Sequence, residues 1–67
     1  MSSIGVEFPK EQMRLRQILK HCHEIGPDCT FLALLIEDCL RRADIAVAEQ
    51  DVVSMIKIYG EMKGFEE

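Results

Sequence analysis

The sequence has little of what membrane-spanning, secreted or nucleic-acid-binding proteins need. It contains no apolar run near the roughly 18 residues that cross a membrane, and MSSIGVEFPKEQ holds no apolar signal core. Basic side chains are outnumbered, with 8 Lys and Arg against 12 Asp and Glu and a net charge of −4. Because nucleic acids and anionic membranes both attract basic surfaces, this balance disfavours non-specific binding to either. We expect a cytoplasmic protein without membrane contact.

The spacing of the metal-ligand residue types is wrong for a metal site. His21, Cys22, His23 and Cys29 lie close together and Cys39 follows, but no CxxC or HxxxH pair occurs. Neighbouring helical residues point about 100° apart, so the two histidines diverge and Cys22 faces the interior. Three cysteines are an odd number, and a reducing cytoplasm favours thiols. We expect free thiols, no metal and no cofactor; a metal- or thiol-based factor is the third alternative.

The chain is short for a stable domain. A domain of this size buries only about 60% of its unfolded surface, so it usually needs a disulfide, a metal or a partner. It also has little room for a pocket, which disfavours nucleophilic catalysis by Cys22 or Cys29 beside a histidine. We predict that the protein is not an enzyme.

Proline and glycine divide the chain into three predicted helices. Pro9 suits the first position of a helix, so residues 1–8 are predicted to form a flexible tail. Other residues that stop or cap helices mark the remaining boundaries: Gly26, Pro27, Asp28 or Thr30, Asp51 and Gly64. The sequence thus predicts an all-α fold. A helical hairpin and a third helix form one domain over residues 9–64, with a tail at 65–67.

The apolar residues of the first two helices form one face on each. On the first helix these are Leu15, Ile18, Leu19, Cys22 and Ile25, with Phe8 at the edge. On the second they are Leu32, Leu35, Ile36, Cys39, Leu40, Ala43, Ala46 and Val47. Outside the second face lie Phe31, Leu34 and Ile45, and the third helix is apolar over more than half its circumference.

This apolar surface exceeds what one copy hides. Short turns favour antiparallel helices, and that packing leaves Phe31, Leu34 and part of the third helix uncovered. A symmetric dimer is the commonest solution. We predict a homodimer whose interface contains Phe31, Leu34, Leu35, Val53, Ile56 and Tyr59. The alternative is that the first helix crosses at an angle and covers Phe31 and Leu34 within one chain.

Two further sets of residues, mostly charged, are candidates for a protein-binding surface. On the first helix, Met13, Arg16, Lys20 and His23 recur every three or four residues opposite the apolar face. Methionine adapts its shape and cations steer acidic partners, so this stripe is a candidate partner-binding site, with a solvated face as the alternative. On the second helix, two ion pairs are predicted at the favourable spacing of four residues, Glu37 with Arg41 and Asp38 with Arg42. These charged residues form either a solvated face or a rim that sets the register of a partner.

A DNA-associated regulator is the leading functional alternative. The first helix carries Lys10, Arg14, Arg16 and Lys20, and helix–turn–helix proteins use short helices joined by a turn with glycine. Against this, the four cations point in two directions and acidic residues offset them. The second and third helices are also too apolar to lie in a groove of DNA.

Three segments, FPKEQMRLRQIL, IGPDCTFLALLIEDCLRRAD and QDVVSMIKIYGEMKG, cover nearly the whole chain. They resemble a group of small helical accessory proteins from the early region of lambda-like tailed phages and prophages, encoded between the exonuclease and excisionase genes. The resemblance implies a cytoplasmic accessory protein in a bacterial host, and it transfers no site residues. We therefore predict a non-enzymatic protein that self-associates and binds an unknown host or phage protein.

Overall fold

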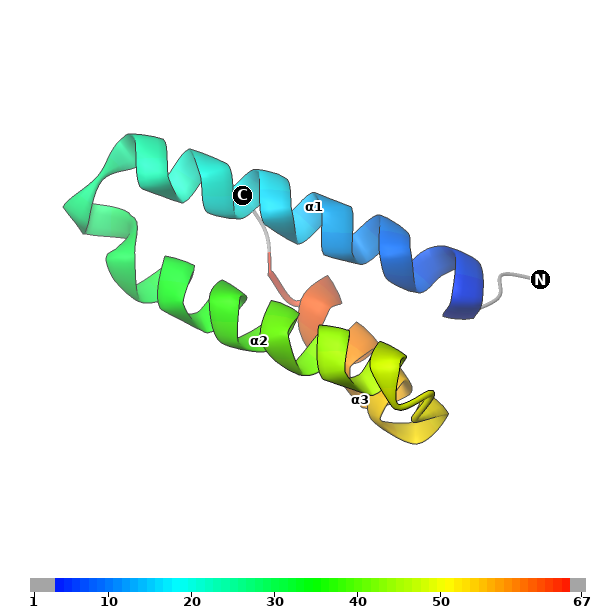
Figure 1. The fold of residues 1–67 in the computed structure, drawn as a ribbon. Helices are drawn as coiled ribbons and strands as arrows, with labels where there is room; N and C mark the ends of the chain where they lie inside the picture. Colours follow the sequence, from blue (N-terminus) through cyan, green and yellow to red (C-terminus); the bar gives the residue numbers. More distant parts are fainter. Residues whose placement is uncertain (1–3, 66–67) are drawn as a thin grey trace.

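Three helices account for nearly all of residues 4–65, the part of the chain that the computed structural model describes. Helix α1 spans Ile4–Ile25, α2 spans Thr30–Ala48 and α3 spans Val52–Lys63, and the 3-10 turn η1 at Pro27–Cys29 joins the first two. The two long helices run antiparallel as a hairpin, and α3 turns back along α2 and also contacts α1 (Figure 1). The predicted all-α fold of three helices is confirmed for these residues.

The first turn is made by backbone contacts. Gly26 has a φ of 101°, which favours glycine, and its N–H donates to the Cys22 carbonyl at 3.1 Å. Pro27 then begins η1, and its carbonyl accepts a hydrogen bond from the N–H of Thr30. The prediction that Asp28 or Thr30 caps the second helix is wrong, because α2 begins without any side-chain cap bond. The 3-10 turn occupies this helix end instead.

The second turn follows the predicted pattern. The Asp51 carboxylate caps α3 and accepts hydrogen bonds from the backbone N–H of Ser54 at 3.2 Å and from its hydroxyl at 2.6 Å. These bonds hold the pKa of Asp51 below its usual range, because they stabilise the charged form. The prediction of Asp51 as the cap is confirmed, and Gly64 follows the last helical residue as expected.

Helix α1 begins five residues earlier than Pro9. Residues 4–8 are helical, so the predicted flexible tail is wrong for them; residues 1–3 lie outside the described part of the chain. Phe8 is fully buried in the core, and burial of an aromatic ring favours continuing the helix. Pro9 is the sixth residue of α1, beyond the first turn, so the helix lacks one backbone hydrogen bond there, and the buried contacts of this segment have to outweigh that loss.

One hydrophobic core lies between the three helices. Its buried members come from all of them: Phe8, Leu15, Ile18, Cys22, Ala33, Ile36, Cys39, Leu40, Ala43, Ala46, Ile58 and Met62. Phe65, expected in the C-terminal tail, packs against this core, and residues 66–67 lie outside the described range. Three predicted core residues are exposed instead, Ile25 at the end of α1 and Leu35 and Val47 on α2.

The length of α3 explains why Leu35 is exposed. This helix has 12 residues, whereas α1 has 22 and α2 has 19. An ion pair between Arg42 and Glu61 places the end of α3 near the middle of α2. The half of the hairpin nearest the first turn therefore lacks a third helix, and Leu35 lies in that half (Figure 1).

The burial of Phe8 yields a test of the early start of α1. Phe8→Ala should lower the free energy of unfolding by about 3–5 kcal/mol, because it removes a buried ring and leaves a cavity. Val6 is the control, because it belongs to the same segment but is 56% exposed, and Val6→Ala should change stability by at most about 0.5 kcal/mol. Urea unfolding followed by circular dichroism measures both. Equal effects would contradict a packed helix over these residues.

Candidate protein-interaction surface

The six residues predicted for a dimer interface are mostly uncovered. Phe31 is 75% exposed and Leu34 is 58% exposed, and Leu35, Val53 and Ile56 are exposed as well. Tyr59 is half-buried and packs against the core. Helix α1 therefore does not cover Phe31 and Leu34, as the single-chain alternative required.

These residues form two surfaces rather than one. On α2, the turn-end patch (Phe31, Leu34 and Leu35) precedes Arg42 by two to three helical turns. On α3, the α3 patch (Val53 and Ile56) precedes Glu61, the partner of Arg42, by one to two turns. Because the helices run in opposite directions, the patches lie at opposite ends of the hairpin, about 20 Å apart.

A network of charges lies between the two patches. Arg42 donates to both Glu61 oxygens at 2.9 and 3.0 Å and to Asp38 at 3.0 Å, and Arg41 donates to Asp38 at 2.7 Å. The Arg42 guanidinium holds the pKa of Glu61 below its usual range. The predicted Asp38–Arg42 pair is confirmed. Arg41 pairs with Asp38 and not with Glu37, the partner predicted for it.

A groove of about 300 Å³ runs between α2 and α3 beside this network. Its apolar lining is Ile45, Ala46 and Ile58, and its remaining lining residues are polar or charged. No histidine or cysteine is among the lining residues, so the groove offers neither a thiol nucleophile nor an imidazole base. The groove is therefore amphipathic, with apolar and charged lining residues side by side.

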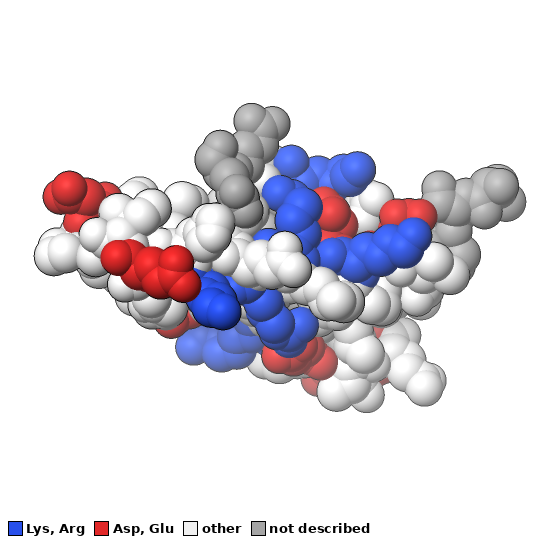
Figure 2. Space-filling view, turned by 90° about the horizontal axis from the view of Figure 1, so that it is seen from above, with Lys and Arg blue, Asp and Glu red and all other residues white. Residues whose placement is uncertain are grey.

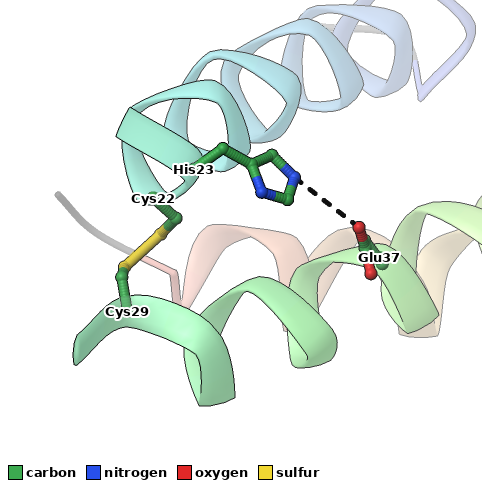
Figure 3. Close-up of a disulfide and its surroundings, with 4 residues drawn as sticks. All are labelled: Cys22, His23, Cys29 and Glu37. Atoms are coloured by element: carbon green, nitrogen blue, oxygen red, sulfur yellow. Dashed lines mark ion pairs between the residues drawn. A yellow bond between two sulfur atoms is a disulfide. The ribbon is translucent and has the colours of Figure 1, made fainter. Parts of the chain in front are cut away.

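Two members of the predicted α1 stripe contact acidic residues of α2. Arg16 Nη2 lies 3.4 Å from Asp44 Oδ1. His23 Nε2 lies 3.7 Å from Glu37 Oε1, with the ring pointing across from α1 to α2 (Figure 3). The second pair is ionic only when the imidazole is protonated. Both contacts contribute to the hairpin itself, which reduces what these side chains offer to another protein.

The other two members of the stripe are open to solvent. Met13 and Lys20 are both exposed, and Lys20 lines a small hollow on α1 together with His21. Lys and Arg side chains gather over the middle of the molecule in the view from above, with acidic groups beside them (Figure 2). Two members of the stripe, Met13 and Lys20, are thus exposed, whereas Arg16 and His23 lie against acidic residues of α2.

Arg14 has a structural role that the sequence did not reveal. Its guanidinium donates to the backbone carbonyls of Met62 and Phe65, each at 2.7 Å, and to the Glu11 carboxylate at 3.1 and 3.2 Å. The last carbonyls of a helix lack intrahelical donors, and a cation favours that negative end. Arg14 thereby fastens the end of α3 to α1. No signal near Arg14 in the sequence points to carbonyls about fifty residues away.

Cys22 and Cys29 form a disulfide between the end of α1 and η1 (Figure 3). The prediction that all three cysteines are thiols is wrong for these two. Their Cα atoms are 5.1 Å apart, within the range for a disulfide, because the turn at Gly26 brings the chain back over Cys22. Cys39 remains a thiol, and burial raises its pKa.

Further features of residues 4–65 bound the possible functions. In this range no three His, Cys, Asp or Glu side chains gather as a potential metal site, and no helix has the length and apolar character to cross a membrane. No family model, curated protein or solved structure matches the chain. The functional argument therefore depends on the surface itself.

The disulfide predicts how many thiols react before and after reduction. We expect one reactive thiol, that of Cys39, when the oxidised chain is denatured without reductant, and three after reduction. Reduction should also lower the free energy of unfolding by about 2–3 kcal/mol, the amount expected for a short closed loop. The double variant Cys22→Ser with Cys29→Ser is the control, since reductant should not change its unfolding. Three reactive thiols before reduction would contradict the bond.

Proposed function

We propose that this protein is a non-enzymatic interaction module that associates with itself and binds a second protein through the exposed apolar surface of α2 and α3. One observation carries the proposal. The described residues expose more large apolar side chains than the core buries, because five of the twelve buried apolar residues are Ala or Cys. The exposed ones are Val6, Met13, Ile25, Phe31, Leu34, Leu35, Ile45, Val47, Val52, Val53 and Ile56.

The arrangement of these residues supports interaction more than their number does. Single exposed apolar residues are normal on any protein surface, whereas contiguous apolar groups mark contact sites. Phe31, Leu34 and Leu35 lie on adjacent turns of one helix, and Val52, Val53 and Ile56 do so on another. A small domain also gains stability from a partner that covers such groups.

The resemblance to lambda-like phage and prophage accessory proteins supports a role in the cytoplasm of a bacterial host, on a host or phage protein. A reducing cytoplasm opens disulfides. There the Cys22–Cys29 bond would not hold the hairpin together, and packing alone would have to do so. Self-association would then supply part of the stability that the bond contributes under oxidising conditions.

The alternative, a DNA-associated regulator, has weaker support. It depends on the basic residues of α1, but Arg14 already binds two carbonyls of the α3 end and Arg16 lies against Asp44. Lys10 also pairs with Glu7 at 3.8 Å. These contacts leave less positive charge for phosphates, so binding to DNA should be weak and should disappear as salt rises.

Self-association has a direct test. The wild type should be a dimer at micromolar concentration in sedimentation equilibrium, and Leu34→Glu should be a monomer, because an unpaired charge is costly in an apolar contact. Its helical signal should be retained, since Leu34 is exposed in the single chain. Val6→Glu introduces the same charge on an exposed apolar site of α1 and should remain a dimer. A monomeric wild type at several hundred micromolar would refute self-association.

The α1 stripe has a separate test. Arg16→Glu with Lys20→Glu should leave the helical signal intact, since the exposed Arg16–Asp44 contact contributes at most about 1 kcal/mol. If the stripe binds the second protein, the variant should lose a partner that the tagged wild type captures from bacterial lysate. Retained capture would make the stripe a solvated face and leave the patches of α2 and α3 as the binding surface.

A further inference from the structure

A spacing of three and four residues marks the outward face of α2. Six residues follow it and together form what we term the α2 seam: Phe31, Leu34, Asp38, Arg41, Ile45 and Ala48. Alternation of three and four is the heptad spacing of paired helices. The seam lies opposite the face of α2 that carries Ile36, Leu40 and Ala43 into the core. Five members are exposed and Asp38 is half-buried.

The order of residues along the seam makes it complementary to itself. It has two apolar residues, one acid, one base and two apolar residues. If a second copy lies antiparallel, Asp38 faces Arg41 of that copy and Leu34 faces its Ile45. A parallel copy would place each charge against its own kind, which is unfavourable. An antiparallel shift by one heptad would place both charges against apolar residues, so only one register satisfies the whole seam.

We propose that two copies of this chain pair through the α2 seam in antiparallel orientation. The twofold axis crosses the seam at the level along α2 that lies midway between residues 39 and 40. This inference rests on the proposed self-association and names its surface, orientation and register. It assigns the turn-end patch to the dimer together with Ile45, which the sequence-based interface omitted. The α3 patch lies outside the seam and remains available to a different protein.

The shape of the seam also suits this pairing. The largest side chain, Phe31, faces the smallest, Ala48, so the two ends of the contact have complementary volumes. Packing against α1 and α3 already forms α2 in the single chain, so association need not order a helix. Arg41 contacts Asp38 of its own chain at 2.7 Å but keeps 73% of its side chain exposed, so it is also accessible to an acid on another copy.

One flank of the seam is acidic and the other is partly apolar. Glu37 and Asp44 border it on the side of α1 and would approach their copies in the dimer. Each already faces a group of α1, His23 for Glu37 and Arg16 for Asp44, and the Arg16 contact reduces repulsion between the acids. On the other flank, Leu35 is exposed and adds apolar surface to the contact.

The size of the seam determines the affinity expected for the dimer. From Phe31 to Ala48 it is about 25 Å long, most of the 36 Å length of the molecule. A contact made by one helix from each copy lies at the small end of stable interfaces, so we expect a dissociation constant of roughly micromolar size.

Cross-linking tests the orientation. Leu34→Cys and Ile45→Cys variants are mixed and treated with a short bismaleimide, which does not exchange with the Cys22–Cys29 disulfide, while Cys39 is buried. The mixture should yield a linked dimer of one Leu34→Cys and one Ile45→Cys chain, identified by mass spectrometry. Each variant alone should give little linked dimer, because equivalent sites are about 16 Å apart along the antiparallel helices.

Two outcomes would overturn the pairing. Efficient linkage of Leu34→Cys to itself would indicate a parallel or shifted contact. Linkage of Leu34→Cys to Ile56→Cys, the matched exposed control on α3, in preference to Ile45→Cys would place the interface elsewhere. In either case self-association would stand, whereas a monomeric wild type would refute both it and the pairing.

Charge exchange tests the seam without new cysteines. Asp38→Arg and Arg41→Asp should each weaken self-association by about tenfold or more, because like charges then meet in the contact. An equimolar mixture of the two variants should recover association close to that of the wild type, because opposite charges meet again. Mixing leaves the contacts within each chain unchanged, so recovery reports on the contact between chains. Sedimentation velocity measures each sample.

The control for this experiment is Lys57→Asp, which makes a comparable charge change on α3 away from the seam. It should associate as the wild type does. If Asp38→Arg and Arg41→Asp also associate as the wild type, or if their mixture does not recover association, the seam is not the contact. Circular dichroism of each variant verifies that the helices remain formed.

Discussion

The difference in length between the hairpin and the third helix governs the rest of this structure. Helices α1 and α2 form a long two-layer hairpin, but α3 has only 12 residues and covers little more than half of it. A hairpin of two helices has two open faces, and one short helix can close only part of one. Apolar residues that a longer third helix would cover, such as Leu35, remain exposed. The surface of the protein follows from this incomplete cover.

Polar contacts fix where the short helix lies. Arg14 donates hydrogen bonds to the carbonyls of Met62 and Phe65, at and just beyond the end of α3. Arg42 donates two hydrogen bonds to the Glu61 carboxylate. The apolar contribution of α3 to the core is small, with Ile58 and Met62 as its buried members. Apolar packing is non-directional, whereas guanidinium contacts have defined geometry. The cations therefore favour one register of α3 against the hairpin, and the exposure of the Arg42–Glu61 pair keeps the energy of that contact modest.

Helix α2 has opposite tasks on its two sides. Its inner side packs small and branched residues, including Ala43 and Ile36, against both neighbours. Its outer side carries the heptad spacing of the α2 seam, with one acid and one base at the centre. A surface of mixed character, apolar at both ends and charged in the middle, discriminates between orientations of a partner better than a uniformly apolar surface does. The disulfide at the first turn ties the start of this helix to α1.

The sequence by itself determined the number of helices, the turns at Gly26 and Asp51, and most of the core faces, because helical periodicity and capping are local properties. It also implied that Phe31 and Leu34 lie outside the core, since they fall off the apolar face of their helix. Only the tertiary structure decided the rest. Burial of Phe8 carries α1 past Pro9, and the return of the chain at the first turn joins Cys22 to Cys29. The level of α3 along the hairpin separates the predicted interface into two patches. Periodicity shows which residues share a face, but the distance between faces depends on turns and on contacts between residues far apart in the chain.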